Sequence, residues 1–175
     1  DRYIPLRMVV EVNVKGTNTL RLVNDHMLED LVLARPVWSC NRQEAMTLAE
    51  RLGAPIDDSK VTIGGGLDDF MHQLCDGLGA TLRAPLVVRV GARGAWIREP
   101  GGETIHIEGY PTKAVHTRSA GGCHTGVMCA MLAKGHSLAE SVKIANAAAS
   151  IAIQHSLNGV PQCPDYDEAI ALIGE

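Results

Sequence analysis

Residues 115–126 read Val-His-Thr-Arg-Ser-Ala-Gly-Gly-Cys-His-Thr-Gly, and the rest of the chain is organised around this stretch. A helical pattern of small and apolar residues follows it, from Val127 to Ala133. The small residues at 119–122 let the backbone approach another molecule, and the helix behind them adds unpaired N–H groups and the positive end of its dipole. Loop and helix together predict an anion site, with phosphate as the usual anion. The alternative is a Gly-rich turn that only leads into a core helix.

Three other segments belong with that stretch. Asn41 and Glu44 form an N-x-x-E element, residues 87–95 form a strand, a turn and a second strand, and residues 145–149 are small residues interrupted by Asn146. Together with residues 115–126, and in this order, they resemble the PfkB, or ribokinase-like, family of carbohydrate kinases. The motif of that family reads D-T-x-G-A-G-D and precedes a helix. Four matches over nearly the whole chain are more specific than one Gly-rich loop.

The resemblance implies an α/β, ribokinase-like fold with a mostly parallel sheet and helices on both faces. It covers the carboxy-terminal part of such a kinase. We therefore expect residues 1–175 to be a single α/β domain, a fragment from which the amino-terminal part and the lid are absent. The residue pattern agrees, because buried strands alternate with helices as in parallel βαβ units. Residues 115–126 are expected at the carboxyl ends of the strands, where open α/β sheets bind ligands.

Both Asp positions of the family motif are replaced in this chain, by His116 and Gly122, and the first motif glycine is Ser119. In the family the second Asp is the general base that takes the proton from the sugar hydroxyl, whereas glycine has no side chain to accept a proton. His116 and His124 are the nearby candidates for a substitute base. They lie six residues before and two residues after position 122, so neither is well placed.

The function that the resemblance implies is an enzyme, an ATP-dependent carbohydrate kinase that transfers a phosphoryl group from ATP to a sugar or related alcohol. The missing Asp at position 122 favours an alternative, a catalytically impaired pseudokinase or nucleotide-binding module. A partial or mutated form of an active kinase is a third reading. The implied cofactors are ATP and Mg²⁺, with a monovalent cation as an optional addition.

The resemblance also assigns roles to residues around the nucleotide. An anion hole is expected from four consecutive backbone amides, those of Ser119, Ala120, Gly121 and Gly122. Contacts with the rest of the nucleotide are expected from Gly91, Arg93, Gly94 and Asn146. Arg93 could equally be an ordinary exposed turn residue, and a buried Asn146 needs hydrogen-bond partners whatever its role.

Asn41 and Glu44 have two interpretations. As the N-cap and third residue of a helix they form a capping box, which stabilises the helix by about 1 kcal/mol and does nothing else. The resemblance instead gives them an indirect metal role, in which they order water around Mg²⁺ and the phosphates. A carboxylate suits that role because Mg²⁺ takes oxygen ligands and keeps waters.

Composition narrows the classes of partner. The net charge of −4 and the 3% of aromatic residues argue against a nucleic-acid surface. Five scattered cysteines without a C-x-x-C pair predict reduced cytosolic thiols rather than a disulfide framework. The apolar run of residues 145–153 is too short to span a bilayer. We therefore expect a cytoplasmic protein with a sugar and a nucleotide as partners and no membrane contact, and a homodimer is compatible with this.

Periodicity and capping signals predict the elements. Helices are expected over residues 26–34, 41–53, 67–78, 123–134, 137–155 and 166–173. Strands are expected over residues 7–14, 37–40, 86–90, 95–97 and 104–107, the last as an edge strand. Residues 158–164 are expected to be loop. The acidic face of the third helix, with Asp68, Asp69, His72 and Asp76, is interpreted as solvated rather than as a metal cluster.

Overall fold

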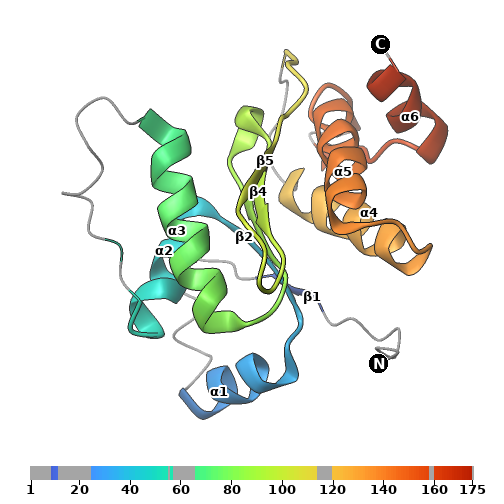
Figure 1. The fold of residues 1–175 in the computed structure, drawn as a ribbon. Coiled ribbons are helices and arrows are strands. Elements are labelled where there is room, and N and C mark those ends of the chain that lie inside the picture. The colour runs from blue at the N-terminus through green and yellow to red at the C-terminus, as the bar shows by residue number, and fades with distance from the viewer. Residues whose placement is uncertain are drawn as a thin grey trace. The chain divides into compact units, whose positions relative to one another are not determined.

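The computed structural model describes residues 9–11, 25–54, 56, 66–113, 120–157 and 160–174 (Figure 1). The chain divides into two compact units. The first unit comprises Asp1–Arg89 and Trp96–His106, and the second comprises Val90–Ala95 and Ile107–Glu175. That residues 1–175 form a single domain stays a prediction.

A five-stranded sheet is the centre of the first unit. Its order is β1-β2-β3-β4-β5, with bounds Val9–Glu11, Val37–Asn41, Leu86–Arg89, Ala95–Arg98 and Ile105–Ile107. β1 pairs with β2 and β2 pairs with β3 in parallel. The connections at 90–94 and 99–104 are too short for the crossover that parallel neighbours need, so β4 and β5 continue the sheet in antiparallel fashion. The sheet is therefore mixed, and the predicted α/β class is confirmed with β5 at the edge.

Three helices accompany this sheet: α1 (Asp25–Ala34), α2 (Arg42–Arg51) and α3 (Gly66–Leu82). α2 packs on β2 and β3, and α3 packs on β3. The predicted third helix is confirmed, and it extends past residue 78 to Leu82, the last of the buried apolar side chains that begin at Met71. The core of the unit includes Trp38, Leu48, Met71, Leu74, Leu78, Leu86 and Val87. α1 packs less tightly than its pattern suggests, since Met27 is 49% exposed.

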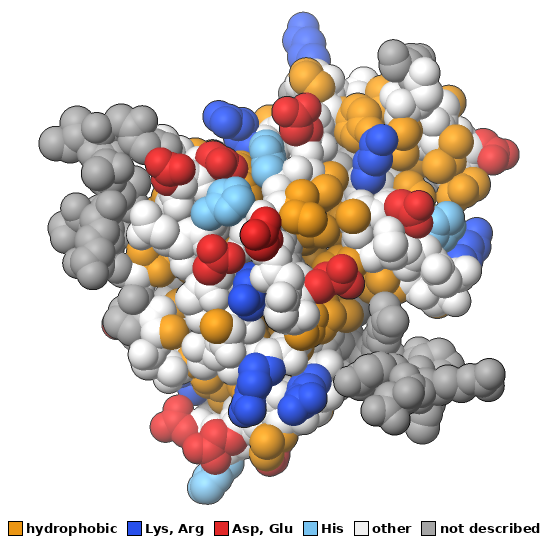
Figure 2. Space-filling model, in the orientation of Figure 1, with side chains coloured by type: hydrophobic (Ala, Val, Ile, Leu, Met, Phe, Trp, Pro, Cys, Tyr) orange, Lys and Arg blue, Asp and Glu red, His pale blue; other side chains and the backbone are white. Residues whose placement is uncertain are grey.

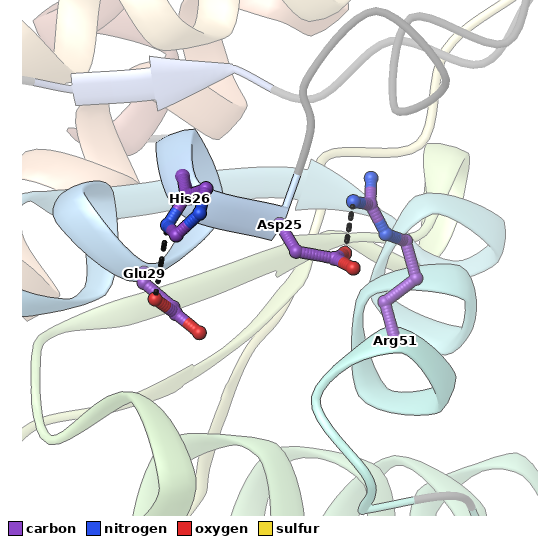
Figure 3. A network of polar contacts seen from close by, with 4 residues as sticks. All are labelled: Asp25, His26, Glu29 and Arg51. Carbon is purple, nitrogen blue, oxygen red and sulfur yellow. Dashed lines mark hydrogen bonds and ion pairs between the residues drawn. The ribbon is translucent and has the colours of Figure 1, made fainter.

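Surface ion pairs surround the start of α1 (Figure 3). Asp25 Oδ1 lies 3.1 Å from Arg51 Nη2 at the end of α2, and His26 Nδ1 lies 3.7 Å from Glu29 Oε2. Because the Asp25 and His26 side chains are more than nine-tenths exposed, such pairs contribute on the order of 0–1 kcal/mol. The Asp25–Arg51 pair joins the start of α1 to the end of α2, whereas His26 and Glu29 both lie on α1, and nothing in the geometry of either pair suggests chemistry.

The second unit is built on three helices: α4 (Ala120–Ala133), α5 (Leu138–Ala152) and α6 (Tyr166–Gly174). α5 packs against both α4 and α6 (Figure 1). Gly135 follows the end of α4 by two residues, and its φ of +95° permits the Schellman bonds Gly135 N to Leu132 O and His136 N to Met131 O, both 3.1 Å. The core contains small and flexible side chains that allow close helix packing, namely Met131, Ile144, Ala147, Ala148 and Ala169.

Further element boundaries in the second unit differ from the prediction. α4 begins at Ala120 rather than at residue 123, and α5 ends at Ala152 rather than near residue 155. Residues 158–164 are not wholly loop, because β6 (Ser156–Leu157) pairs with β7 (Val160–Pro161) in antiparallel fashion. The dipeptide Asn158-Gly159 between them is a hairpin signal that the sequence reading passed over.

The prediction of reduced thiols is wrong for two cysteines. Cys123 and Cys163 form a disulfide with a Cα–Cα distance of 5.8 Å. Their separation of 40 residues carries no sequence signal, because the pairing depends on how α4 meets the segment before α6. Cys40 and Cys75 are buried and take no part in it. Burial raises the pKa of the Cys75 thiol to about 12 and raises that of Cys40 further, so neither is a reactive thiolate.

Among the described residues, no helix is long and apolar enough to cross a membrane. On the face of the molecule in Figure 2, acidic and basic side chains are interspersed rather than gathered by sign.

Candidate functional site

The first turn of α4 contains the predicted anion-binding amides. Ala120, Gly121 and Gly122 lie in this turn, where backbone N–H groups have no partner within the helix. They are therefore helical rather than loop residues, but their amides keep the predicted direction along the helix axis. Gly122 is exposed, and no atom lies within 4 Å of the position its Cβ would take. Ser119 and His116 lie outside the described residues.

A tight backbone crossing forms the second part of the site. Gly91–Arg93 is a short 3₁₀ turn between β3 and β4. Gly94 has a φ of +86°, and a Cβ there would lie under 3.0 Å from Ile107 O and the backbone of Gly109. A Cβ on Gly109 would in turn lie under 3.0 Å from Ala92 O. Only glycine fits at these two positions, because backbone atoms occupy the space that a side chain needs.

The 91–94 turn matches the tight turn predicted from its glycines. Gly91 has a φ of +49° with open space around it, and Arg93 is exposed. The turn is closed by the bonds Gly94 N to Gly91 O at 3.1 Å and Val90 N to Gly94 O at 2.8 Å. Contact of Gly91, Arg93 and Gly94 with a nucleotide stays a prediction.

Asn146 links the crossing to α4. Its side chain is 5% exposed, and Nδ2 donates to Ile107 O and Glu108 O at 3.1 Å each. Its Oδ1 lies 2.8 Å from His124 Nε2. Because both amide protons go to carbonyl oxygens, Oδ1 must accept, and His124 must carry a proton on Nε2. The partners that a buried Asn146 required are thus present, and its part in nucleotide binding stays a prediction.

His124 is poorly placed as a substitute base. Its side chain is 4% exposed, and its Nε2 proton is engaged by Asn146. A general base must come within hydrogen-bond reach of a substrate hydroxyl, and a buried imidazole between two helices does not. The sequence reading identified His124 only by its nearness to Gly122 and missed its bond to Asn146, which lies 22 residues away.

In the first unit, the capping box of α2 is confirmed. Asn41 Oδ1 accepts from Glu44 N, and Glu44 Oε2 accepts from Asn41 N, both at 2.9 Å. The Glu44 side chain is buried. The described residues contain no group of three or more His, Cys, Asp or Glu side chains that could hold a metal ion. A metal role for Asn41 and Glu44 through water stays a prediction.

The acidic face of α3 is partly engaged rather than simply solvated. Asp68 Oδ1 accepts from Trp96 Nε1 at 2.8 Å, and Asp76 accepts from Thr104 Oγ1. The Trp96 ring stacks on His106 with centroids 3.9 Å apart. The two hydrogen bonds attach α3 to β4 and to the segment before β5. They could not be predicted from the sequence, because each joins residues 28 positions apart.

Known proteins resemble this chain in sequence and in fold. A sugar kinase of Escherichia coli K12, YegV, itself uncharacterised, is 33% identical over 133 residues, which is 76% of this chain and 37% of that protein. The ribokinase of Thermotoga maritima has a similar fold, with a TM-score of 0.68 and 17% identity over 95% of this chain and 48% of its own. The ribokinase of Arabidopsis thaliana, solved with ribose and ATP, has a TM-score of 0.60 and 23% identity over 78% of this chain and 40% of its own.

The chain spans less than half the length of these relatives. The structural similarity confirms the predicted ribokinase-like fold. A family profile described as pfkB family carbohydrate kinase matches residues 28–163, which include the 91–94 turn, the first turn of α4 and Asn146. The chain belongs to the pfkB family of carbohydrate kinases.

Proposed function

We propose that this chain supplies the nucleotide-binding part of an ATP-dependent carbohydrate kinase, which transfers a phosphoryl group from ATP to a sugar or related alcohol. The observation that carries the proposal is the first turn of α4, where Ala120, Gly121 and Gly122 have a methyl group or no side chain, Gly122 is exposed, and the position of a Cβ on Gly122 has open space around it. In a family of phosphotransferases, an anion at this turn is most simply a nucleotide phosphate.

The phosphate side of the proposed site consists of backbone amides. Those of Ala120, Gly121 and Gly122, with Ser119 before them, would donate to phosphate oxygens and add the dipole of α4. Backbone donors suit phosphoryl transfer, because its catalysis is largely positioning and electrostatic stabilisation. Small residues at these positions allow the phosphate to approach the main chain.

The adenosine side is proposed along the glycine crossing. Gly91 has open space at its Cβ position and permits close approach of a ligand, and Arg93 is exposed beside it. Gly94 lets the turn lie against the backbone of residues 107–109, which Asn146 holds at Ile107 O and Glu108 O. Support comes from the family profile, which spans these residues, and from the printed ligands of the Arabidopsis ribokinase, ribose and ATP.

Mg²⁺ is the proposed metal, with a monovalent cation as an optional addition. When bound, Mg²⁺ would neutralise charge on the phosphates. Asn41 and Glu44 would act on it through water, as suits a cation that keeps much of its hydration shell. The capping box does not exclude this role, because it uses one oxygen of the Glu44 carboxylate.

Position 122 decides between the two forms of the proposal. In the family motif the base stands there, and this chain has glycine, so an impaired kinase or nucleotide-binding module is the alternative. Buried His124 is not a replacement. The wider proposal also includes a cytoplasmic location, small-molecule partners, no nucleic-acid or membrane partner, and compatibility with a homodimer.

The test is to titrate the intact protein with ATP, with and without Mg²⁺, and to measure ADP formation with a panel of sugars. ATP binding with sugar-dependent ADP formation supports the kinase. ATP binding without turnover on any sugar supports the nucleotide-binding module. Absence of ATP binding in both conditions refutes the proposed function.

A further inference from the structure

We propose that His124 and Asn146 act as a pair of positioning residues, which hold the phosphate side and the adenosine side of the proposed nucleotide site in register. The inference rests on the proposed function, and it concerns residues that act through the backbone rather than by touching the ligand. Its basis is one buried chain of hydrogen bonds that runs between the two sides.

The phosphate end of this chain is His124. It follows Gly122 by two residues on α4, so it moves with the helical turn that carries the anion-binding amides. Nε2 donates to Asn146 Oδ1 at 2.8 Å, within the normal range for such a bond. A rotation or slide of α4 against α5 therefore breaks this bond before it changes the apolar contacts around it.

The adenosine end is the backbone of residues 107–109. Asn146 Nδ2 fixes Ile107 O and Glu108 O, and the same segment crosses Gly94 with no room for even one more carbon atom. Because the crossing is that tight, the 91–94 turn cannot move toward residues 107–109. Asn146 thus limits the position of the turn through a segment that it holds at two carbonyls.

The polar character of the pair is itself informative. The surrounding contacts between α4, α5 and α6 are made by Met131, Ile144 and alanines, which would pack without any polar group. Burying an imidazole and an amide is costly unless they are hydrogen-bonded, and the directional bonds of His124 Nε2 and of both ends of the Asn146 amide favour one geometry over its neighbours. A simple helix contact needs no such network, whereas a site with two halves to align does.

The test compares a ligand that spans both sides with its two parts. ATP, adenosine and tripolyphosphate are titrated separately into the intact protein and its variants. If the pair aligns the two sides, its loss lowers the affinity for ATP, which must contact both sides at once. The affinities for adenosine and for tripolyphosphate, which each contact one side, stay nearly unchanged. A merely structural residue would lower stability without changing the ratio of ATP affinity to the affinities of the parts.

Four variants make the comparison specific. Asn146→Leu removes the whole chain of bonds at similar volume, and His124→Leu removes only its α4 end. His124→Gln keeps a donor near the position of Nε2 and should rescue binding. Ser150→Ala is the matched control, because Ser150 Oγ also ties α5 to this segment, at Tyr110 O and 2.9 Å, but has no bond to His124 or to residues 107–108.

We expect Asn146→Leu to weaken ATP binding by roughly 10- to 100-fold, the scale of one or two buried hydrogen bonds. His124→Leu should weaken it about tenfold, and the double variant little more than Asn146→Leu alone, since residues of one network are not additive. Adenosine and tripolyphosphate should change less than about threefold in every variant. His124→Gln and Ser150→Ala should bind ATP within about threefold of the unaltered protein.

Three results would overturn the inference. One is unchanged ATP affinity in folded Asn146→Leu. Another is a loss of adenosine affinity as large as the loss for ATP, which would make Asn146 a direct ligand. The third is weakening in Ser150→Ala equal to that in His124→Leu. If Asn146→Leu does not fold, the inference is decided by comparing His124→Leu with His124→Gln, using the ratio of ATP affinity to the affinities of adenosine and tripolyphosphate. Absence of ATP binding by the unaltered protein refutes the proposed function, and this inference with it.

Discussion

Two helix starts in the second unit are built in opposite ways. α5 begins with a capping box, in which Ser137 Oγ accepts from Glu140 N and Glu140 Oε2 accepts from Ser137 N, both at 3.2 Å. α4 begins with Ala120, Gly121 and Gly122, none of which has a side chain that could accept from an amide. The start of α5 uses its own residues to satisfy its donors, whereas residues 120–122 of α4 contribute no side-chain acceptor.

The start of α4 is held by distant residues instead. Cys123 in its first turn is bonded to Cys163, and His124 is bonded to Asn146 on α5. Two side chains that directly follow residues 120–122 thus connect the start of α4 to Cys163 and to α5. The comparison teaches that a helix whose first turn has no side-chain acceptor can be held by long-range bonds, and the pair of helices offers a way to test this.

The largest expected effect comes from restoring a carboxylate at the open start. We predict that Gly122→Asp raises sugar-dependent ADP formation by roughly 10²- to 10⁴-fold, the usual contribution of a positioned general base. The side chain fits, since no atom lies within 4 Å of its Cβ position. The helix dipole would keep the carboxylate ionised and able to accept a proton. Steady-state ADP release by the intact protein measures the effect.

The matched control for this change is Gly126→Asp. Gly126 lies one helical turn later on α4, is exposed, and has equally open space at its Cβ position. A carboxylate there adds the same charge to the same helix without occupying the position of the base. Equal ADP formation in both variants would mean that position 122 is not where this chain uses a base.

The second prediction concerns the covalent restraint on α4. Reduction of Cys123–Cys163, or Cys163→Ser, should lower the free energy of unfolding by about 3–5 kcal/mol, as chain-entropy arguments give for a loop of this length. Exposed Cys163 makes the bond accessible to a reductant. Denaturant unfolding with and without a reductant measures the change.

Cys129→Ser serves as the control for that prediction, because Cys129 lies on the same helix and takes no part in the disulfide. A reductant should still destabilise this variant, whereas it should have no further effect on Cys163→Ser. If reduction left the unfolding curve of the unaltered protein in place, the restraint on the start of α4 would have to come from its hydrogen bonds alone.

The third prediction removes one donor from the open start. Proline is tolerated at the first position of a helix, where its missing N–H breaks no bond. Ala120→Pro should therefore leave the helix intact and weaken ATP binding by about tenfold, the scale of one hydrogen bond to a charged group. Arg42→Pro, at the first position of capped α2, should leave ATP affinity unchanged. An equal loss in both would indicate damage to the helices rather than loss of a donor.

The contrast between the helix starts also shows what the sequence could predict. The capping box of Asn41 and Glu44 was predicted, and the box of Ser137 and Glu140 and the terminator Gly135 are equally visible in the sequence, because the partners lie within a few residues. The bonds His124–Asn146, Asp68–Trp96 and Cys123–Cys163 were not, since they join residues 22, 28 and 40 positions apart. The family motif located the site in the chain, but only the fold shows what holds it.

The smallest effect is expected at the capped start of α5. Ser137→Ala should lower the free energy of unfolding by about 1 kcal/mol, the usual cost of losing an N-cap. ATP affinity should not change, because the donors of α5 already have partners within the chain. A thermal or denaturant titration beside an ATP titration separates the two outcomes.

Glu140 gives this last comparison a pH dependence. Hydrogen bonds from the backbone and side chain of Ser137, with a further contribution from His136, hold the pKa of the Glu140 carboxyl below its ordinary value of 4.5. A carboxyl whose pKa is lowered by folding stabilises the folded state above its unfolded pKa and loses that contribution as the pH falls through the folded pKa. The free energy of unfolding of the unaltered chain should therefore decline below pH 4.5, and part of this decline should be absent in Glu140→Gln. Glutamine can still accept the capping hydrogen bond but cannot titrate. Identical pH profiles for Glu140→Gln and the unaltered chain would show that the carboxylate charge contributes nothing at this helix start.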